Sequence, residues 1–222
     1  MIRTEHLEVR RTALLASLGP EPGPAVRELW YLLHGQAMRA AQILEMARTL
    51  DDGSRLLVAP EALNRHYVGP AVAKDAPIGA TWMTRAEREA DISDNVAYLE
   101  SAHAHLRRQF GGVTPPVTVL GFSQGGAAAV RWAANGSIKP ARLIVWESSL
   151  PPEVDYRALV ERQPAMHITY VCGTRDKFIT PKVLEAQHAL LKEANVQFDE
   201  VSFDGGHRLD DSALRQVSRP EV

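Results

Sequence analysis

The residues with the clearest chemical potential form the run Gly121-Phe122-Ser123-Gln124-Gly125-Gly126. A β-branched apolar segment, 117–120, precedes this run, and an alanine-rich segment with high helix propensity follows it. A serine on a tight turn between a strand and a helix presents its hydroxyl group to solvent, and the flanking glycines leave the room that such a turn needs. The backbone N–H of Gln124 would lie at a helix N-terminus, where it can face a developing oxyanion. The pattern therefore predicts a nucleophilic serine at position 123. A chance match is expected in roughly 5–10% of chains of this length, so the strand and helix around the run carry much of the argument.

A nucleophilic serine needs a general base, and the base needs a carboxylate that orients it. We expect His207 to be the base, because Gly205 and Gly206 before it would let its loop approach Ser123 closely. Asp176 follows the apolar segment 167–172 and is the expected orienting acid. Because ligands bind outside the carboxyl ends of parallel strands, these side chains should meet at one edge of the sheet.

Other residues of the same types are weaker candidates. Asp204, Asp210 and Asp211 lie very close in sequence to His207, and Asp155 and Asp199 have the pattern of surface charges. The remaining histidines lie in edge, loop or helical contexts: His6, His66, His103, His105, His167 and His188. His103 and His105 are two residues apart on an expected helix and would face different directions, so a metal pair is not predicted. Cys172 ends an apolar strand and should be buried rather than nucleophilic.

A second group of candidates concerns substrate binding. His34-Gly35-Gln36 follows an apolar strand, and the backbone N–H of Gln36 is expected to be the second oxyanion donor. His34 should hydrogen-bond this loop, and a purely structural role for the whole loop is the alternative. Residues 60–84 contain three prolines and no period, so we expect an irregular loop that forms part of the substrate-site wall through Tyr67, Trp82 and Met83.

The order of elements predicts an α/β fold. Strands are expected over 27–33, 56–59, 117–120, 143–146, 167–172 and 196–203, with one or two edge strands within 3–17. Helices are expected over 40–50, 84–110, 155–162 and 209–217, after Gly125, and from Pro181 with Thr180 as N-cap. The segment Thr84 to Glu87 has the pattern of a capping box. We therefore predict one domain over 1–222, with a mostly parallel sheet of about six or seven strands, helices on both faces and no large separate cap domain.

The composition narrows the classes of function. The chain has 222 residues, of which 45% are hydrophobic and 23% charged, and its formal net charge of −2 favours neither a nucleic-acid partner nor an anionic membrane. The charged N-terminus and the absence of an apolar run of about 18 residues predict a cytoplasmic protein without stable membrane insertion. The single cysteine permits no intramolecular disulfide. A homodimer is compatible with this sequence, which specifies no oligomeric state.

Four motifs together resemble the phospholipase/carboxylesterase family of α/β-hydrolases, relatives of acyl-protein thioesterases and small bacterial carboxylesterases. They are Leu33-His34-Gly35, the run around Ser123, Gly173-Thr174-Arg175-Asp176 with Pro181, and Gly206-His207. The chain order Ser, Asp, His is that of α/β-hydrolases. The resemblance implies Ser123, Asp176 and His207 as a catalytic triad, with the N–H groups of Gln36 and Gln124 as oxyanion hole. After the His-Gly element this chain reads Gln36-Ala37-Met38-Arg39, where family members usually carry a further glycine.

We therefore expect a serine hydrolase that needs no cofactor or metal and cleaves carboxylic esters of short to medium acyl chains through an acyl-enzyme. One alternative keeps the same triad and changes the substrate to a thioester or a lysophospholipid. The other alternative is a binding protein that retains the fold without turnover.

Overall fold

The chain is described here by a computed structural model, which covers residues 1–69 and 75–219. Over these residues the main sheet has seven strands: β1 (Leu15–Leu18), β2 (Glu28–Leu33), β3 (Arg55–Pro60), β6 (Val117–Phe122), β7 (Arg142–Trp146), β8 (His167–Gly173) and β9 (Asp199–Phe203). The helices are α1 (Ala40–Met46), a 3-10 turn (Arg48–Leu50), α2 (Arg88–Gln109), α3 (Gln124–Asn135), α4 (Tyr156–Arg162), α5 (Pro181–Glu193) and α6 (Asp211–Val217). A two-stranded sheet consists of β4 (Asn64–Tyr67) and β5 (Ile78–Thr81).

The strand order in the main sheet is β1-β3-β2-β6-β7-β8-β9. β1 pairs with β3 in the antiparallel sense, and every other pairing in this sheet is parallel. Alternate residues of β2 belong to two separate cores: Leu29 and Tyr31 pack on one face, and Trp30 and Leu32 on the other. Because both faces of the sheet are covered, its central strands are continuously apolar. The α/β fold predicted from the sequence is confirmed.

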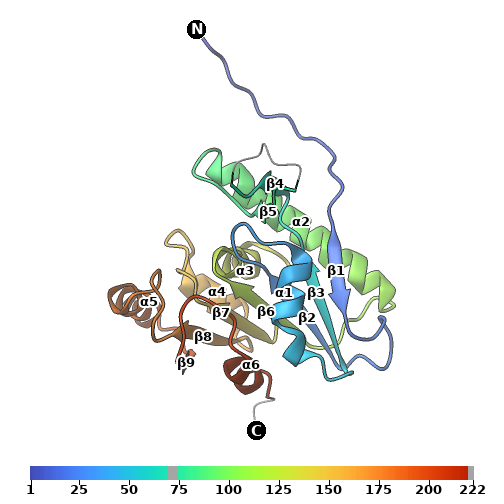
Figure 1. The fold of residues 1–222 in the computed structure, drawn as a ribbon, viewed down its shortest axis with the longest axis vertical. Coiled ribbons are helices and arrows are strands. Elements are labelled where there is room, and N and C mark those ends of the chain that lie inside the picture. The colour runs from blue at the N-terminus through green and yellow to red at the C-terminus, as the bar shows by residue number, and fades with distance from the viewer. Residues whose placement is uncertain (70–74, 220–222) are drawn as a thin grey trace.

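Helices cover both faces of the sheet. Residues of α2, α3, α4 and α5 belong to the core on one face, and residues of α1 and α6 belong to the core on the other face (Figure 1). Connections that cross from one strand to the next bring the carboxyl ends of β2, β6, β7, β8 and β9 to one edge. The site therefore forms at that edge, as in other open parallel sheets. Over the described residues, none of the helices has the length and apolar character that spanning a membrane requires.

Residues 60–84 differ from the expected irregular loop. Within the described part of this segment, Asn64–Tyr67 and Ile78–Thr81 pair as an antiparallel ladder, β4 with β5. The prolines do not disrupt this ladder, since Pro60 ends β3 and Pro77 precedes β5, while Pro70 lies outside the described residues. The prediction failed because Pro60 and Pro77 lie at or beside strand ends, where a missing N–H does not interrupt the β4–β5 ladder.

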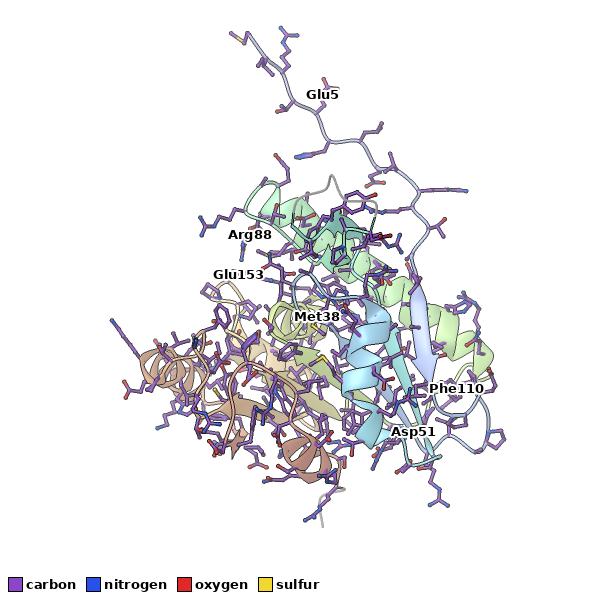
Figure 2. The ribbon with its side chains drawn as sticks, viewed as in Figure 1. Glu5, Met38, Asp51, Arg88, Phe110 and Glu153 are labelled. Atoms are coloured by element: carbon purple, nitrogen blue, oxygen red, sulfur yellow. The ribbon has the colours of Figure 1, made fainter. Side chains whose placement is uncertain are left out.

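The C-terminal end of the long helix α2 was predicted correctly, but its N-terminal end was not. Its end near Phe110 agrees with the expectation, but it begins at Arg88 rather than beside Thr84. Glu87 has a left-handed backbone, with φ of 53°, and the N–H of Thr84 donates to the Asp91 carboxylate at 3.1 Å. The capping box is therefore wrong, because the Asp91 carboxylate in the first helical turn binds the incoming chain. Arg88, at the start of α2, points toward Glu153 of the β7–α4 connection and pairs with it at 2.8 Å (Figure 2).

Two further expectations concern shorter segments. Of the one or two edge strands expected within 3–17, only the part included in β1 is a strand. The carbonyl of Leu14 accepts from the N–H of Glu61 at 2.9 Å, and the chain before it extends away from the sheet toward the N-terminus (Figure 1). The N-cap of α5 is confirmed, because the Thr180 hydroxyl accepts from the N–H of Val183 and Pro181 is the first helical residue.

Candidate active site

Ser123 lies on a strained turn between β6 and α3. Its φ of 53° and ψ of −123° place it outside the regions that non-glycine residues usually adopt, and its N–H donates to the carbonyl of Trp146 at 2.9 Å. A Cβ on Gly121 would collide with the carbonyl of Gly125, and a Cβ on Gly125 would collide with the carbonyl of Leu33. The strand and helix therefore pack closely only because both flanking residues are glycines, as the sequence predicted.

His207 and Asp176 meet at the same edge of the sheet. Nδ1 of His207 lies 2.8 Å from Oδ2 of Asp176, although the two residues lie on different loops, after β9 and β8. The loops are joined by a hydrogen bond of 2.7 Å from the N–H of Arg175 to the carbonyl of Gly205. Since Asp176 is an acceptor, this contact assigns the ring hydrogen of neutral His207 to Nδ1 and leaves Nε2 as an acceptor.

The Asp176 carboxylate is well suited to remain ionised. Burial by itself would raise its pKa, but hydrogen bonds from His207 and from the backbone N–H groups of Phe178 and Ile179 hold the pKa below its ordinary value. The carboxylate thus carries its negative charge while it orients the imidazole.

The His207 ring and Ser123 line the same cleft. The ring packs between Phe122 and Phe178, with ring centroids 5.0 and 4.8 Å away. The cleft has a volume of about 500 Å³ and is lined by Gly35, Gln36, Ala37, Met38, Phe122, Ser123, Gln124, Ala127, Glu147, Ser148, Ser149, Phe178, Ile179 and His207. A small substrate in this cleft would contact the hydroxyl and the imidazole together.

Two backbone N–H groups border the cleft near Ser123. Gln124 is the first residue of α3, whose first N–H groups have no acceptor within the helix. Among the residues that the structure describes, no acceptor pairs with the N–H of Gln36 or of Gln124. That these N–H groups bind an oxyanion, as expected from the sequence, stays a prediction.

The loop that carries Gln36 is held from two sides. The N–H of Ala37 donates to the carbonyl of Ala80 at 2.9 Å, and the N–H of Ala80 donates to the carbonyl of Met38 at 3.0 Å, so β5 supports the loop. Arg39 pairs with the buried carboxylate of Glu61 at 2.5 Å. β5 and Glu61 therefore support the cleft wall that this loop forms.

The side chain of Gln124 has a role that the sequence did not reveal. Its Oε1 accepts from the hydroxyl of Thr81 and from the N–H of Trp82, both at 2.9 Å, and its Nε2 donates to the carbonyl of Met83 at 2.8 Å. This amide ties the end of β5 to the turn that holds Ser123. No sequence signal indicated these contacts, because they join segments more than 40 residues apart.

Trp82, Tyr67 and Met83 were expected to contact the substrate, and the structure places them elsewhere. Trp82 is only 1% exposed, and its indole N–H donates to the carbonyl of His34 at 2.8 Å. Tyr67 ends β4 and is 56% exposed, away from the residues that line the cleft. Met83 borders a separate small cavity beside Arg131. Trp82 thus packs behind the loop rather than in the cleft, while Phe178, which lines the cleft and is 70% exposed, was missed.

The alternative candidates for the acid and the nucleophile make other contacts in the structure. Asp204 pairs with Arg175, and Asp210 accepts from the N–H groups of Ser212 and Ala213 at the start of α6. Burial raises the pKa of the Cys172 thiol to about 12, so this residue is a buried strand-end thiol, as expected.

Glu147 is the second residue that sequence reasoning did not assign to the site. It follows β7 directly, at the carboxyl edge of the sheet, and its Oε2 lies 3.6 Å from Nδ1 of His207. Glu147, Asp176 and His207 each offer one atom that could bind a metal ion, and these atoms all lie within 4.8 Å of one another.

A strained serine, an oriented imidazole and two available N–H groups form a set that can transfer an acyl group.

Comparison with known proteins was consistent with this geometry. Residues 52–215 match the model of a family described as serine hydrolase (FSH1). No significant match was found among curated protein sequences. Among solved structures, the chain is similar to esterase PE8, with 18% identity, coverage of 94% of this chain and 97% of the other, and a TM-score of 0.66.

Two further structures are similar over most of their length. A carboxylesterase from Mesorhizobium loti shows 19% identity, covers 86% of this chain and 87% of its own, and gives a TM-score of 0.68. A phospholipase/carboxylesterase from Dyadobacter fermentans shows 15% identity, covers 95% and 97%, and gives a TM-score of 0.63. At these identities the likeness establishes a shared fold.

Proposed function

The chain belongs to the FSH1 serine hydrolase family, and from this premise we propose that it is a carboxylesterase whose catalytic residues are Ser123, His207 and Asp176. One observation carries the proposal. The His207 ring lines the same cleft as Ser123, while its Nδ1 lies 2.8 Å from a carboxylate that is itself held by two backbone N–H groups.

The mechanism follows from the partners of each group. His207 accepts the hydroxyl proton of Ser123 through Nε2 as the serine oxygen attacks the ester carbonyl carbon. The N–H groups of Gln36 and Gln124 donate to the resulting oxyanion. His207 then gives the proton to the departing alcohol, which leaves an acyl-enzyme on Ser123. Water, deprotonated by the same imidazole, attacks the acyl carbon. The bond from this carbon to the Ser123 oxygen then breaks, His207 returns the proton to that oxygen, and the carboxylic acid is released.

The cleft favours small substrates. Its volume of about 500 Å³ is in the lower part of the range for small-molecule sites, and its walls include the apolar side chains of Met38, Phe178 and Ile179. Apolar walls suit an acyl chain, and the limited volume favours chains of short to medium length. Met38 lies in the loop between β2 and α1 (Figure 2), and its carbonyl accepts a hydrogen bond from Ala80 of β5.

Replacement of the nucleophile tests the proposal. Ser123→Ala should lower kcat on a chromogenic acetate or butyrate ester by a factor of about 10⁴ to 10⁶, since the attacking oxygen is lost. Ser101→Ala, which removes an exposed hydroxyl on α2, is the matched control and should keep the parental rate. A fluorophosphonate probe should label the parent protein and the control but not Ser123→Ala. Retention of more than a few per cent of the rate in Ser123→Ala would contradict the assignment.

The same reagents separate the alternatives. Rates on matched oxygen esters and thioesters of equal chain length distinguish an esterase from a thioesterase, and we expect the oxygen ester to be preferred. A folded protein that neither reacts with the probe nor turns over any ester would instead be a binding protein.

A further inference from the structure

Glu147 lies immediately after β7, at the same edge of the sheet as Asp176 and His207, which follow β8 and β9. Its side chain is 0% exposed, and its Oε2 is 3.6 Å from Nδ1 of His207. Its Oε1 accepts a hydrogen bond of 3.1 Å from the N–H of Gly173, the last residue of β8. Two buried carboxyl groups, those of Glu147 and Asp176, therefore lie beside one imidazole nitrogen.

One oxygen of Glu147 lacks a hydrogen-bond donor. Among the described residues, no N–H or O–H donates to its buried Oε2, and the Nδ1–H of His207 is directed to Asp176. An ionised carboxylate can only accept, and an unsatisfied buried polar group costs about 1–3 kcal/mol, or more when it is charged. A protonated carboxyl group could instead donate from this position, and the Asp176 carboxylate beside it is an acceptor.

The surroundings determine which of the two carboxyl groups holds the proton. Asp176 accepts from His207 and from two backbone N–H groups, which favour its ionised form. Burial, followed by the nearby charge of Asp176, raises the pKa of Glu147 to about 8, and the backbone N–H groups of Gly173 and Arg208 offset this only in part. At neutral pH the proton therefore belongs on Glu147.

No other nearby group supplies a compensating positive charge. Within the described part of the chain, His207 is the only basic side chain within 4.0 Å of the Glu147 carboxyl group. The titratable groups that β8 contributes here are Tyr170 and Cys172, and burial raises the pKa of both, so both are neutral. An ionised Glu147 would consequently face the charge of Asp176 with little compensation.

The backbone of Glu147 is also strained. Its φ is 45°, in the left-handed region that favours glycine, and its N–H donates to the carbonyl of Val171 at 2.7 Å. A non-glycine residue in this region costs about 1–3 kcal/mol and persists where the surroundings impose it, often at functional sites. The strain directs the carboxyl group inward, toward Asp176 and His207.

We propose that Glu147 is a positioning residue of this site: its protonated carboxyl group donates a hydrogen bond to Asp176, and the two carboxyl groups share one negative charge behind His207. The inference rests on the proposed function, because it assigns Glu147 an effect on the base of that reaction. A single shared charge orients the imidazole and stabilises its protonated form. A second charge would stabilise the imidazolium further and make it a weaker acid toward the leaving alcohol.

Two substitutions separate the proton from the shape of the side chain. Glu147→Gln keeps an N–H donor and cannot ionise, whereas Glu147→Leu removes the donor. We expect Glu147→Leu to lower kcat about 10- to 100-fold with KM changed about twofold or less, and Glu147→Gln to recover most of this loss. The parent protein should show an inflection in kcat near pH 8 that both variants lack. Glu185→Gln, an exposed glutamate on α5, is the matched control and should keep the inflection.

Infrared difference spectroscopy reports the proton directly. The parent protein at pH 7 should show the carbonyl band of a protonated buried carboxyl group, which disappears above about pH 8 and is absent in Glu147→Gln. A residue that acted only through packing would produce no such band. Circular dichroism and urea unfolding of each variant establish that the compared proteins are folded.

Several outcomes would overturn the inference. These are the absence of the band at pH 7, an inflection that persists in Glu147→Gln, or equal activity of Glu147→Leu and the parent protein. A divalent cation bound stoichiometrically by Glu147, Asp176 and His207 and lost to a chelator would also overturn it, since the ion would take the place of the proton. The infrared band is measured without turnover, so it can be present even if Ser123→Ala shows that the proposed function is wrong.

Discussion

Two loops at the carboxyl edge of the sheet each place a histidine beside the cleft, and the two histidines have different surroundings. In the β2–α1 connection, His34 is fully buried, its Nδ1 lies 2.7 Å from the carbonyl of Gly35, and its Nε2 accepts from the N–H of Ala62 at 3.0 Å. In the β9–α6 connection, one nitrogen of His207 is bound to Asp176, and the other has no partner among the described residues.

The comparison indicates that the partners of the two nitrogens, rather than the position after a strand, determine what each histidine can do. His34 uses Nδ1 to bind Gly35 in its own loop and Nε2 to bind Ala62 in the β3–β4 connection, and burial lowers its pKa, so it remains neutral. His207 has a carboxylate partner that can stabilise a positive charge, and a free nitrogen that faces the cleft. Only the second arrangement can accept and release a proton during a reaction.

The largest expected effect is on catalysis by the β9–α6 loop. His207→Ala should lower kcat on a chromogenic ester by a factor of about 10⁴ to 10⁶, because the serine loses its general base, with only a small change in the melting temperature. His105→Ala, which removes an exposed histidine from α2, is the matched control and should retain full activity. A loss of less than about tenfold in His207→Ala would remove the distinction between the two loops.

The next effect is on the stability of the β2–α1 loop. His34→Phe keeps a ring of similar size beside Trp82 but leaves the N–H of Ala62 and the carbonyl of Gly35 without their partner. We expect the free energy of unfolding in urea to fall by about 2–6 kcal/mol, at about 1–3 kcal/mol for each of the two buried unsatisfied groups.

Activity should respond differently from stability in this variant. Removal of an oxyanion donor typically lowers kcat by about 10²-fold or more. At temperatures where His34→Phe is folded, its kcat should fall by less than this, because the N–H of Gln36 remains present. If His34→Phe were as inactive as His207→Ala while retaining its stability, His34 would belong to the reaction itself.

The smallest effect is on the pH dependence of stability. The folded-state pKa of His34 is lowered from 6.5 by burial, so the unfolded chain binds more protons between the folded pKa and 6.5. Stability from this group is therefore fully present above pH 6.5 and decreases as the pH falls below it. The difference in unfolding free energy between the parent protein and His34→Phe should shrink below pH 6.5, by at most about 1.4 kcal/mol per pH unit. A difference that is constant from pH 7 to about pH 5 would contradict this.

Much of the fold was predictable because its signals are local. The continuous apolar strands, the helical spacing after them and the glycines around Ser123 all depend on residues within a few positions of one another. The errors arose where distant residues compete with a local signal. The capping box before α2 was displaced because the Asp91 carboxylate binds the N–H of Thr84. β4 pairs with β5 because Pro60 and Pro77 fall at or beside strand ends.

The sequence by itself determined the order of the parallel strands and of the helices between them, the strained serine turn, and the placement of His207 and Asp176 after strands that end at one edge. Strand periodicity and glycine geometry are properties of short segments, so these features could be predicted. Only the tertiary structure decided that Phe178 rather than Trp82 lines the cleft, and that Glu147 joins Asp176 behind His207. These contacts follow from the lateral order of β7, β8 and β9 and from how their loops pack, and such long-range neighbours leave no periodic signal in the chain.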